Sequence, residues 1–219
     1  MVEKEDKQLG SGNENSADEA SSCEIIRLMR LAREKSRDYA PYWEWPPDRR
    51  RVELQAAQVL REFLVRRGEL VSGQLSQVSN DPPDVLLISS DGLRIGIEVT
   101  ELVDSDAIER NVYRKQHGLP NTYDWSEWDE PRLKNNLTRI INLKEHKLTK
   151  VTPHYDDLFL AIITDEPIIN ELLASRVVEQ CNLASFSISR AFFLLGYHPL
   201  TDTSLYPDGC AVFEVPLNK

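Results

Sequence analysis

The fold is decided by residues 81–102, which read DPPDVLLISSDGLRIGIEVTEL. Two apolar runs stand on either side of Asp91-Gly92, a pair typical of the turn in a β-hairpin. In the second run apolar and other residues alternate, so the two sets face opposite sides of a strand. The set without large apolar side chains comprises Arg94, Gly96, Glu98 and Thr100. The pattern predicts a carboxylate, Glu98, in mid-strand beside a glycine, Gly96, that leaves open space over the sheet.

A second carboxylate, Asp84, begins the first strand of this hairpin. A three-residue connection, 90–92, places Asp84 opposite Glu98 on one face. A two-residue turn at 91–92 instead points Asp84 to the other face, because a shift of one residue reverses every side chain. An active site at this pair therefore requires the longer turn or a bulge.

The flanking segments predict an α/β fold with a mixed central sheet flanked by helices. A helix is expected where apolar residues recur every three or four positions without proline, and a strand where short apolar runs occur. Residues 104–130 are polar and interrupted, and resemble an insertion or long connection. The expected helices are 52–67, 131–151 and 168–183, and the expected strands are 70–78, 85–89, 93–102, 158–164, 191–195 and 211–215.

Composition limits what the chain can do. It has 219 residues, with 36 acidic against 26 basic side chains and a net charge of -10, so any contact with nucleic acid is expected to be local or assisted by metal. No apolar run approaches the roughly 20 residues that span a bilayer, and the start lacks a signal-peptide pattern, so we expect a soluble, cytoplasmic protein without a membrane partner.

The chain divides into three parts by composition. Residues 1–22 predict a disordered acidic tail. Residues 23–48 predict a short basic amphipathic helix and a connector rich in Trp and Pro. The domain itself is expected to cover 49–219.

Two neighbouring carboxylates repel each other unless a cation or a proton lies between them. Oxygen ligands of this kind suit Mg²⁺ or Mn²⁺, which also bind phosphate oxygens. Asp84 and Glu98 are therefore candidate metal ligands in a site for phosphodiester hydrolysis.

These residues resemble the signature of the PD-(D/E)xK nuclease superfamily, which has the restriction-endonuclease-like fold. Its pattern is Pro-Asp before a strand, a hairpin, then Glu-x-Lys. Pro83-Asp84 resembles the first half and Glu98-Val99-Thr100 the second, with Thr100 in place of lysine. The order helix, three strands, helix, strand over about residues 50–165 also resembles the core of that family, here with added helices and strands.

The resemblance implies an endonuclease that hydrolyses DNA with Mg²⁺ or Mn²⁺, in defence against foreign DNA. It makes Asp84, Glu98 and the backbone carbonyl of Val99 metal ligands. Because cutting two strands needs two sites, it also implies a homodimer or a partner protein. The alternative is a catalytically inactive nuclease-like fold that serves as a binding or assembly module.

Many members of the family add a glutamate from the first core helix, and Glu53 is the candidate here. Its spacing from Ala57, Leu60 and Leu64 puts it on the sheet-facing side. The alternative is an acid in the first helical turn, stabilised there by the helix dipole.

The missing lysine has two candidate replacements. Lys144 falls at the centre of the apolar stripe of the helix that follows Pro131, and Lys147 at its edge. Either ammonium could enter the pocket over Glu98 and replace the motif lysine. The alternative for Lys144 is that its stem lies on the sheet while its ammonium reaches water.

Two further expectations follow from this interpretation. Since paired carboxylates repel, Asp84→Asn or Glu98→Gln is expected to leave stability equal or higher. Four aromatic residues of the 104–130 connection could stack on bases or anchor the connection to the core. They are Tyr113, Tyr123, Trp125 and Trp128.

Overall fold

A computed structural model describes residues 49–70, 72–79, 82–119, 127–150, 155–196, 204, 206–207 and 209–218. The predicted tail at 1–22 and the predicted helix and connector at 23–48 lie outside the described residues, as do Tyr123 and Trp125.

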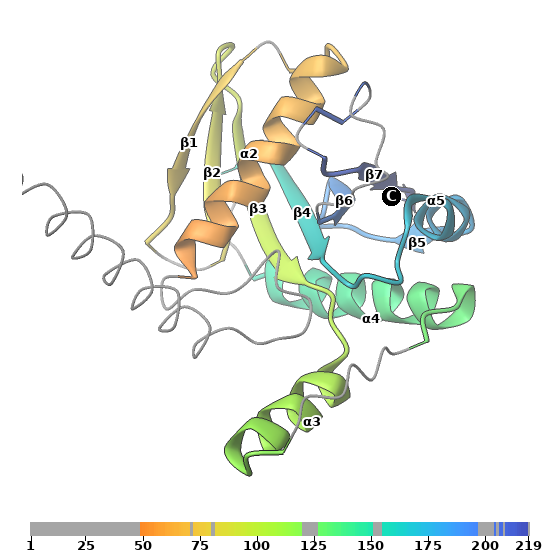
Figure 1. Cartoon of the computed structure of the whole chain (residues 1–219). Coiled ribbons are helices and arrows are strands. Elements are labelled where there is room, and N and C mark those ends of the chain that lie inside the picture. Colours follow the sequence, from red (N-terminus) through yellow and green to blue (C-terminus); the bar gives the residue numbers. More distant parts are fainter. Residues whose placement is uncertain are drawn as a thin grey trace, which may run out of the picture. The chain divides into compact units, whose positions relative to one another are not determined.

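A mixed sheet of six strands forms the centre of the described chain, as predicted (Figure 1). Its order is β1-β2-β3-β4-β6-β7. The first three strands are antiparallel, β3, β4 and β6 run parallel, and β7 is antiparallel to β6. The strands are β1 (Gly73–Gln77), β2 (Val85–Ser89), β3 (Arg94–Glu101), β4 (Asp157–Thr164), β6 (Arg190–Leu195) and β7 (Val212–Val215), with β5 (Leu183–Ala184) and β8 (Leu217–Asn218) pairing separately.

Helices cover both faces of the sheet. The first, α2 (Arg50–Arg66), buries its apolar stripe against one side of β2, β3 and β4. Two others, α4 (Glu130–Leu148) and α5 (Glu171–Glu179), enclose a second core on the opposite face. Ile95 and Ile97 of β3 belong to the first core, whereas Leu160 and Ile162 of β4 belong to the second. Glu98, which is out of phase with Ile97, therefore faces the α4 side.

The 104–130 segment contains a helix that the sequence analysis did not predict. Helix α3 (Ser105–Gln116) starts where the Asp104 side chain accepts hydrogen bonds from the N–H groups of Asp106 and Ala107. The helix escaped prediction because most of its residues are polar or charged, and among them only Ala107 is buried. Its sequence signals are the capping Asp104, the acidic Asp106 in its first turn and the basic residues in its last turn.

Two helix ends also differ from expectation. Asn170 caps α5 by accepting a hydrogen bond from the N–H of Leu173, so the helix begins at Glu171 rather than 168. At its other end the chain leaves the helix after Glu179, and Leu183 joins β5. Among the described helices, none has the length and apolar character needed to cross a bilayer.

One carboxylate of α4 holds the loop that leads into β6. Glu145 accepts hydrogen bonds from the Ser185 hydroxyl at 2.6 Å and from the N–H groups of Ser187 at 2.8 Å and of Phe186 and Ile188 at 3.1 Å. Burial alone would raise the pKa of Glu145, but these hydrogen bonds outweigh it, and the pKa is lower than usual. The loop is therefore fixed to α4 by an ionised side chain.

We predict that Glu145→Gln lowers the free energy of unfolding by about 2 kcal/mol at neutral pH, because the charged acceptor is lost. A carboxyl whose pKa is lowered in the folded state stabilises the protein above its ordinary pKa of 4.5 and loses that effect as the pH falls through the folded-state value. Urea unfolding should therefore show the difference between wild type and variant shrinking in acid. Glu109→Gln, on the exposed side of α3, is the control, and a difference that does not depend on pH would contradict the prediction.

Candidate active site

The β2–β3 hairpin has the longer of the two predicted connections. The Ser89 N–H donates to the Leu93 carbonyl at 3.0 Å, which leaves 90–92 as the loop. Gly92 has a φ of 89°, a conformation that favours glycine and fits a three-residue turn. The side chain of Asp91 also bonds the Ser89 hydroxyl, and this contact lowers the pKa of Asp91. The turn is thus fixed by its own side chains.

This turn brings the two predicted carboxylates together. The β2–β3 register pairs Val85 with Ile97, and one further step sets Asp84 opposite Glu98. Both are buried, with 7% of Asp84 and 1% of Glu98 exposed. Asp84 Oδ2 accepts a hydrogen bond from the Val99 N–H at 2.8 Å. Since the N–H and C=O of a strand residue point to the same side, the Val99 carbonyl also faces the β2 side of β3.

Both candidate lysines reach Glu98. Lys144 Nζ lies 2.7 Å from Glu98 Oε1, and Lys147 Nζ lies 3.2 Å from the same oxygen. Lys144 is 17% exposed and Lys147 is 42% exposed, as their places at the centre and edge of the helical stripe predicted. The ammonium of Lys144 therefore pairs with the carboxylate rather than extending to water. From the sequence the two lysines are alternatives, whereas the structure brings both to one oxygen.

The second oxygen of Glu98, Oε2, differs from Oε1 in its contacts. Within the described part of the chain, Glu98 Oε2 is buried and has no hydrogen-bond partner. A buried carboxylate oxygen without a partner is costly, because it has lost water and gained nothing in exchange. A cation bound at Oε2 would remove this cost.

The residues at this position fit Mg²⁺ or Mn²⁺. Glu98 Oε2, Asp84 and the Val99 carbonyl are hard oxygen donors of the kind that these ions prefer. Among the described residues, no three His, Cys, Asp or Glu side chains cluster closely enough to bind a metal by themselves. Mg²⁺ does not require such a group, since it commonly keeps several waters and uses one or two carboxylates.

Glu53 does not join this pair in a three-acid group. It is only 7% exposed, so its predicted place on the sheet-facing side of α2 is confirmed. However, α2 covers the face of the sheet opposite to Glu98, and Arg49 Nε lies 2.8 Å from Glu53 Oε1. Its observed position is that of a first-turn acid paired within its own helix.

The prediction of open space over Gly96 is wrong. A Cβ at this position would lie 2.8 Å from Leu158 Cδ2, 2.9 Å from Pro83 Cγ and 3.2 Å from Tyr155 Cδ1. The glycine is needed because other side chains fill the space, among them the proline that precedes Asp84. Strand alternation gives the face of a residue but not what comes from a distant segment to cover it.

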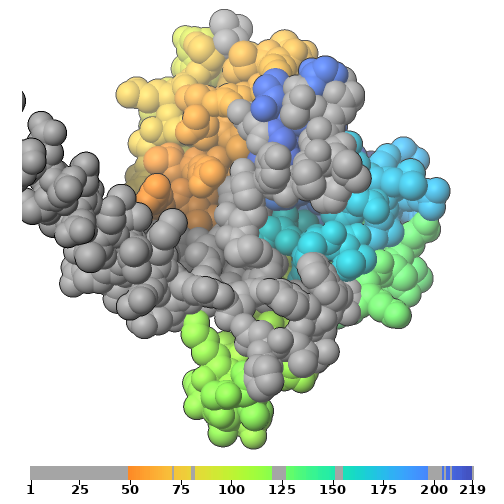
Figure 2. Space-filling view, viewed as in Figure 1, coloured from red at the N-terminus to blue at the C-terminus, as the bar shows by residue number. Residues whose placement is uncertain are grey.

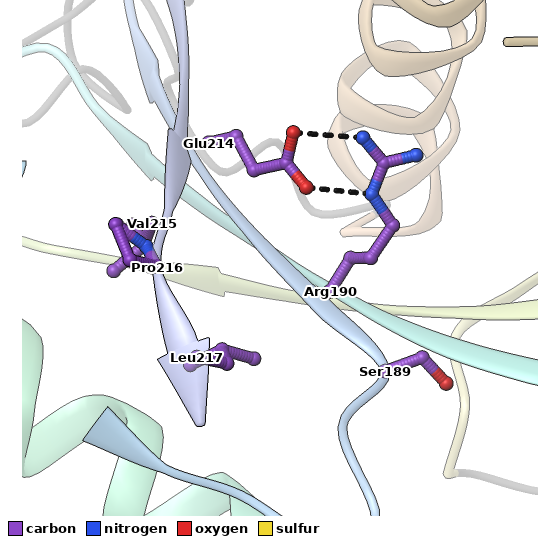
Figure 3. Close-up of a pocket in the computed structure, with 6 residues that line it drawn as sticks. All are labelled: Ser189, Arg190, Glu214, Val215, Pro216 and Leu217. Carbon is purple, nitrogen blue, oxygen red and sulfur yellow. Dashed lines mark hydrogen bonds and ion pairs between the residues drawn. The ribbon is translucent and has the colours of Figure 1, made fainter. Parts of the chain in front are cut away.

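A hollow of about 400 Å³ lies elsewhere, between the start of β6 and the end of β7 (Figure 3). Its charged groups are already paired: Arg190 binds Glu214 through two hydrogen bonds of 2.7 and 2.8 Å, and Glu69 at 2.6 Å. The hydrogen bonds that Arg190 donates to Glu214 and Glu69 raise the pKa of Arg190. This hollow therefore offers no unsatisfied charged group to a ligand, unlike the Glu98 site.

No protein-family model matches the chain, and comparisons with curated proteins and with solved structures give no significant match. The function of the chain therefore has to be inferred from the geometry of the site.

We predict that Glu98→Gln lowers the free energy of unfolding by about 3 kcal/mol, because the largely buried Lys144 ammonium loses its counter-charge. This reverses the expectation from carboxylate repulsion alone, since two lysines already neutralise Glu98. Adding Lys144→Met should restore much of the loss, and adding the more exposed Lys147→Met should restore less. Urea unfolding of the single and double variants tests this, and a more stable Glu98→Gln protein would contradict it.

Proposed function

We propose that the chain is a divalent-metal-dependent nuclease of the PD-(D/E)xK type that hydrolyses phosphodiester bonds in DNA. The observation that carries the proposal is the arrangement around Glu98. One oxygen of this buried carboxylate binds two lysine ammonium groups, and the other has no hydrogen-bond partner among the described residues. Asp84 lies opposite Glu98 on the neighbouring strand β2.

The order of elements supports the proposal. Leaving α3 aside, the chain runs through α2, the antiparallel strands β1 to β3, then α4 and the parallel strand β4. This resembles the helix, three strands, helix, strand core of the restriction-endonuclease-like fold. A shared fold is an analogy and does not establish chemistry, so the site residues have to supply the rest.

The roles of the residues follow from their positions. Asp84, Glu98 Oε2 and the Val99 carbonyl would hold Mg²⁺ or Mn²⁺, which when bound polarises a phosphodiester and lowers the pKa of a water. Lys144 and Lys147 would supply the positive charge that Thr100 lacks, stabilising the negative charge that develops on the phosphate. Their shared contact with Glu98 Oε1 keeps both ammonium groups at the site before substrate arrives.

The same contacts also support a second candidate function. Because Lys144 and Lys147 neutralise Glu98 without a metal, the cluster could be purely structural, in an inactive nuclease-like fold that acts as a binding or assembly module. Uptake of metal separates the two, since a structural cluster has no need of an ion at Glu98 Oε2.

We predict cleavage of supercoiled and linear DNA that requires Mg²⁺ or Mn²⁺ and is abolished by Asp84→Asn or Glu98→Gln. Lys144→Ala should lower the cleavage rate at least about 100-fold while metal still binds, since a group that assists proton transfer or charge stabilisation is typically worth that much. Lys150→Ala, at the exposed end of the same segment, is the matched control.

The lysine variants also test the assignment within the site. Loss of activity in Lys147→Ala but not in Lys144→Ala would move the role to Lys147. Full activity in both would end the proposal that a relocated lysine serves this site. Absence of any metal-dependent cleavage in the wild type would favour the structural alternative.

A further inference from the structure

Helix α3 is anchored to the rest of the domain at its beginning. Asp104, which caps the helix, is held by two further hydrogen bonds. Its backbone N–H donates to Glu166 Oε1 at 2.7 Å, and its Oδ2 accepts from Arg132 Nη2 at 3.0 Å. Within the helix only Ala107 is buried, while Ile108, Asn111 and Arg114 are partly buried. Its last two turns therefore contribute no fully buried side chain to the core of the domain.

Those last turns are locally basic within a chain that is acidic overall. From 110 to 119 the sequence reads RNVYRKQHGL, with three basic residues and no acidic one, in a chain whose net charge is -10. This is a local positive segment of the kind that a generally acidic protein needs for contact with phosphates. Arg110 is exposed on it.

An aromatic pair ends the same helix. The rings of Tyr113 and His117 stack with centroids 4.1 Å apart and an interplanar angle of 28°, and Tyr113 is 57% exposed. His117 Nδ1 lies 2.7 Å from the Tyr113 carbonyl oxygen, which fixes the orientation of the imidazole. Two large rings are thus held in place at the surface without being buried, and part of α3 is visible at the surface in the space-filling view (yellow-green, at the bottom of Figure 2).

We propose that Arg110, Tyr113 and His117 form a binding surface for unpaired nucleotides, and that the nuclease acts on DNA with a single-stranded segment. The inference rests on the proposed function, because the strand that carries Glu98 leads directly into Asp104 and α3. The face of a base is available for stacking only when the base is unpaired or at an end, and an aromatic ring accepts any base in this way.

The layout of the helix agrees with this choice of ligand. The carboxyl end of a helix bears partial negative charge, which disfavours a phosphate but not the face of a neutral base. Arg110 stands two turns earlier, where a phosphate can be bound. At about 1.5 Å per residue the distance from Arg110 to His117 is about 10 Å, close to the rise of about three stacked nucleotides.

Fluorescence anisotropy tests this surface without turnover. The probe is a fluorescein-labelled oligothymidylate strand, compared with a blunt duplex of equal length, and both are titrated with Glu98→Gln protein in EDTA. Adding Tyr113→Ala should weaken binding of the single strand about tenfold, the usual loss for one stacked base, while Tyr113→Phe should retain it. Adding Arg110→Ala should weaken binding of the single strand. It should also reduce the slope of log affinity against log salt concentration by about 1, the value for one lost phosphate contact.

Phe186→Ala is the matched control, because it removes a side chain that is 88% exposed from a different loop. Unchanged single-strand binding in Tyr113→Ala and Arg110→Ala, or no single-strand binding at all before substitution, would overturn the inference. An equal loss for the blunt duplex would also overturn it, since stacking on unpaired bases would not explain that result.

The outcome is separable from that of the proposed function. If α3 binds the single strand and no metal supports cleavage, the proposed nuclease activity is wrong and the proposed binding surface is supported. If the wild type cleaves DNA and the α3 variants bind and cleave it as well as the wild type does, the proposed binding surface is wrong and the proposed nuclease activity is supported.

Discussion

The constraint on which the site depends is the burial of the Glu98 carboxylate in mid-strand, 1% exposed and facing a helix. An ionised carboxylate at such a position has to be paired, because the interior does not solvate it. Lys144 and Lys147 of α4 supply that pairing at one oxygen and thereby link the helix to β3. The unpartnered Oε2 then stands out as the one polar group of this cluster that the described chain does not satisfy.

The sequence predicted this arrangement where a strict period applied. Strand alternation predicted that Asp84 lies opposite Glu98 if the turn has three residues, and the helical period predicted that Lys144 points to the sheet. The prediction from sequence was wrong where side chains from a distant segment determine the surroundings of a residue. Nothing near Gly96 signals that Pro83 and Tyr155 fill its face.

The mixed sheet and the helices with apolar stripes were predictable for the same reason, because burial imposes a period on the residues that it selects. Helix α3 was not predicted, since most of its residues are polar and only Ala107 is buried. Residues that stay exposed show a weaker pattern in the sequence than residues that burial selects. Tyr113 and His117 are four residues apart, a spacing that brings two side chains together only in a helix. Because the helix was not predicted, their stacking was not predicted either.

The account is tested most directly by the anomalous scattering of Mn²⁺ soaked into crystals of the wild-type protein. It predicts an anomalous peak in contact with both Asp84 and Glu98, with Lys144 remaining at the site. A structure at millimolar Mn²⁺ with no peak at these carboxylates, and with both lysines still bound to Glu98, would contradict it and identify the cluster as a structural ion pair.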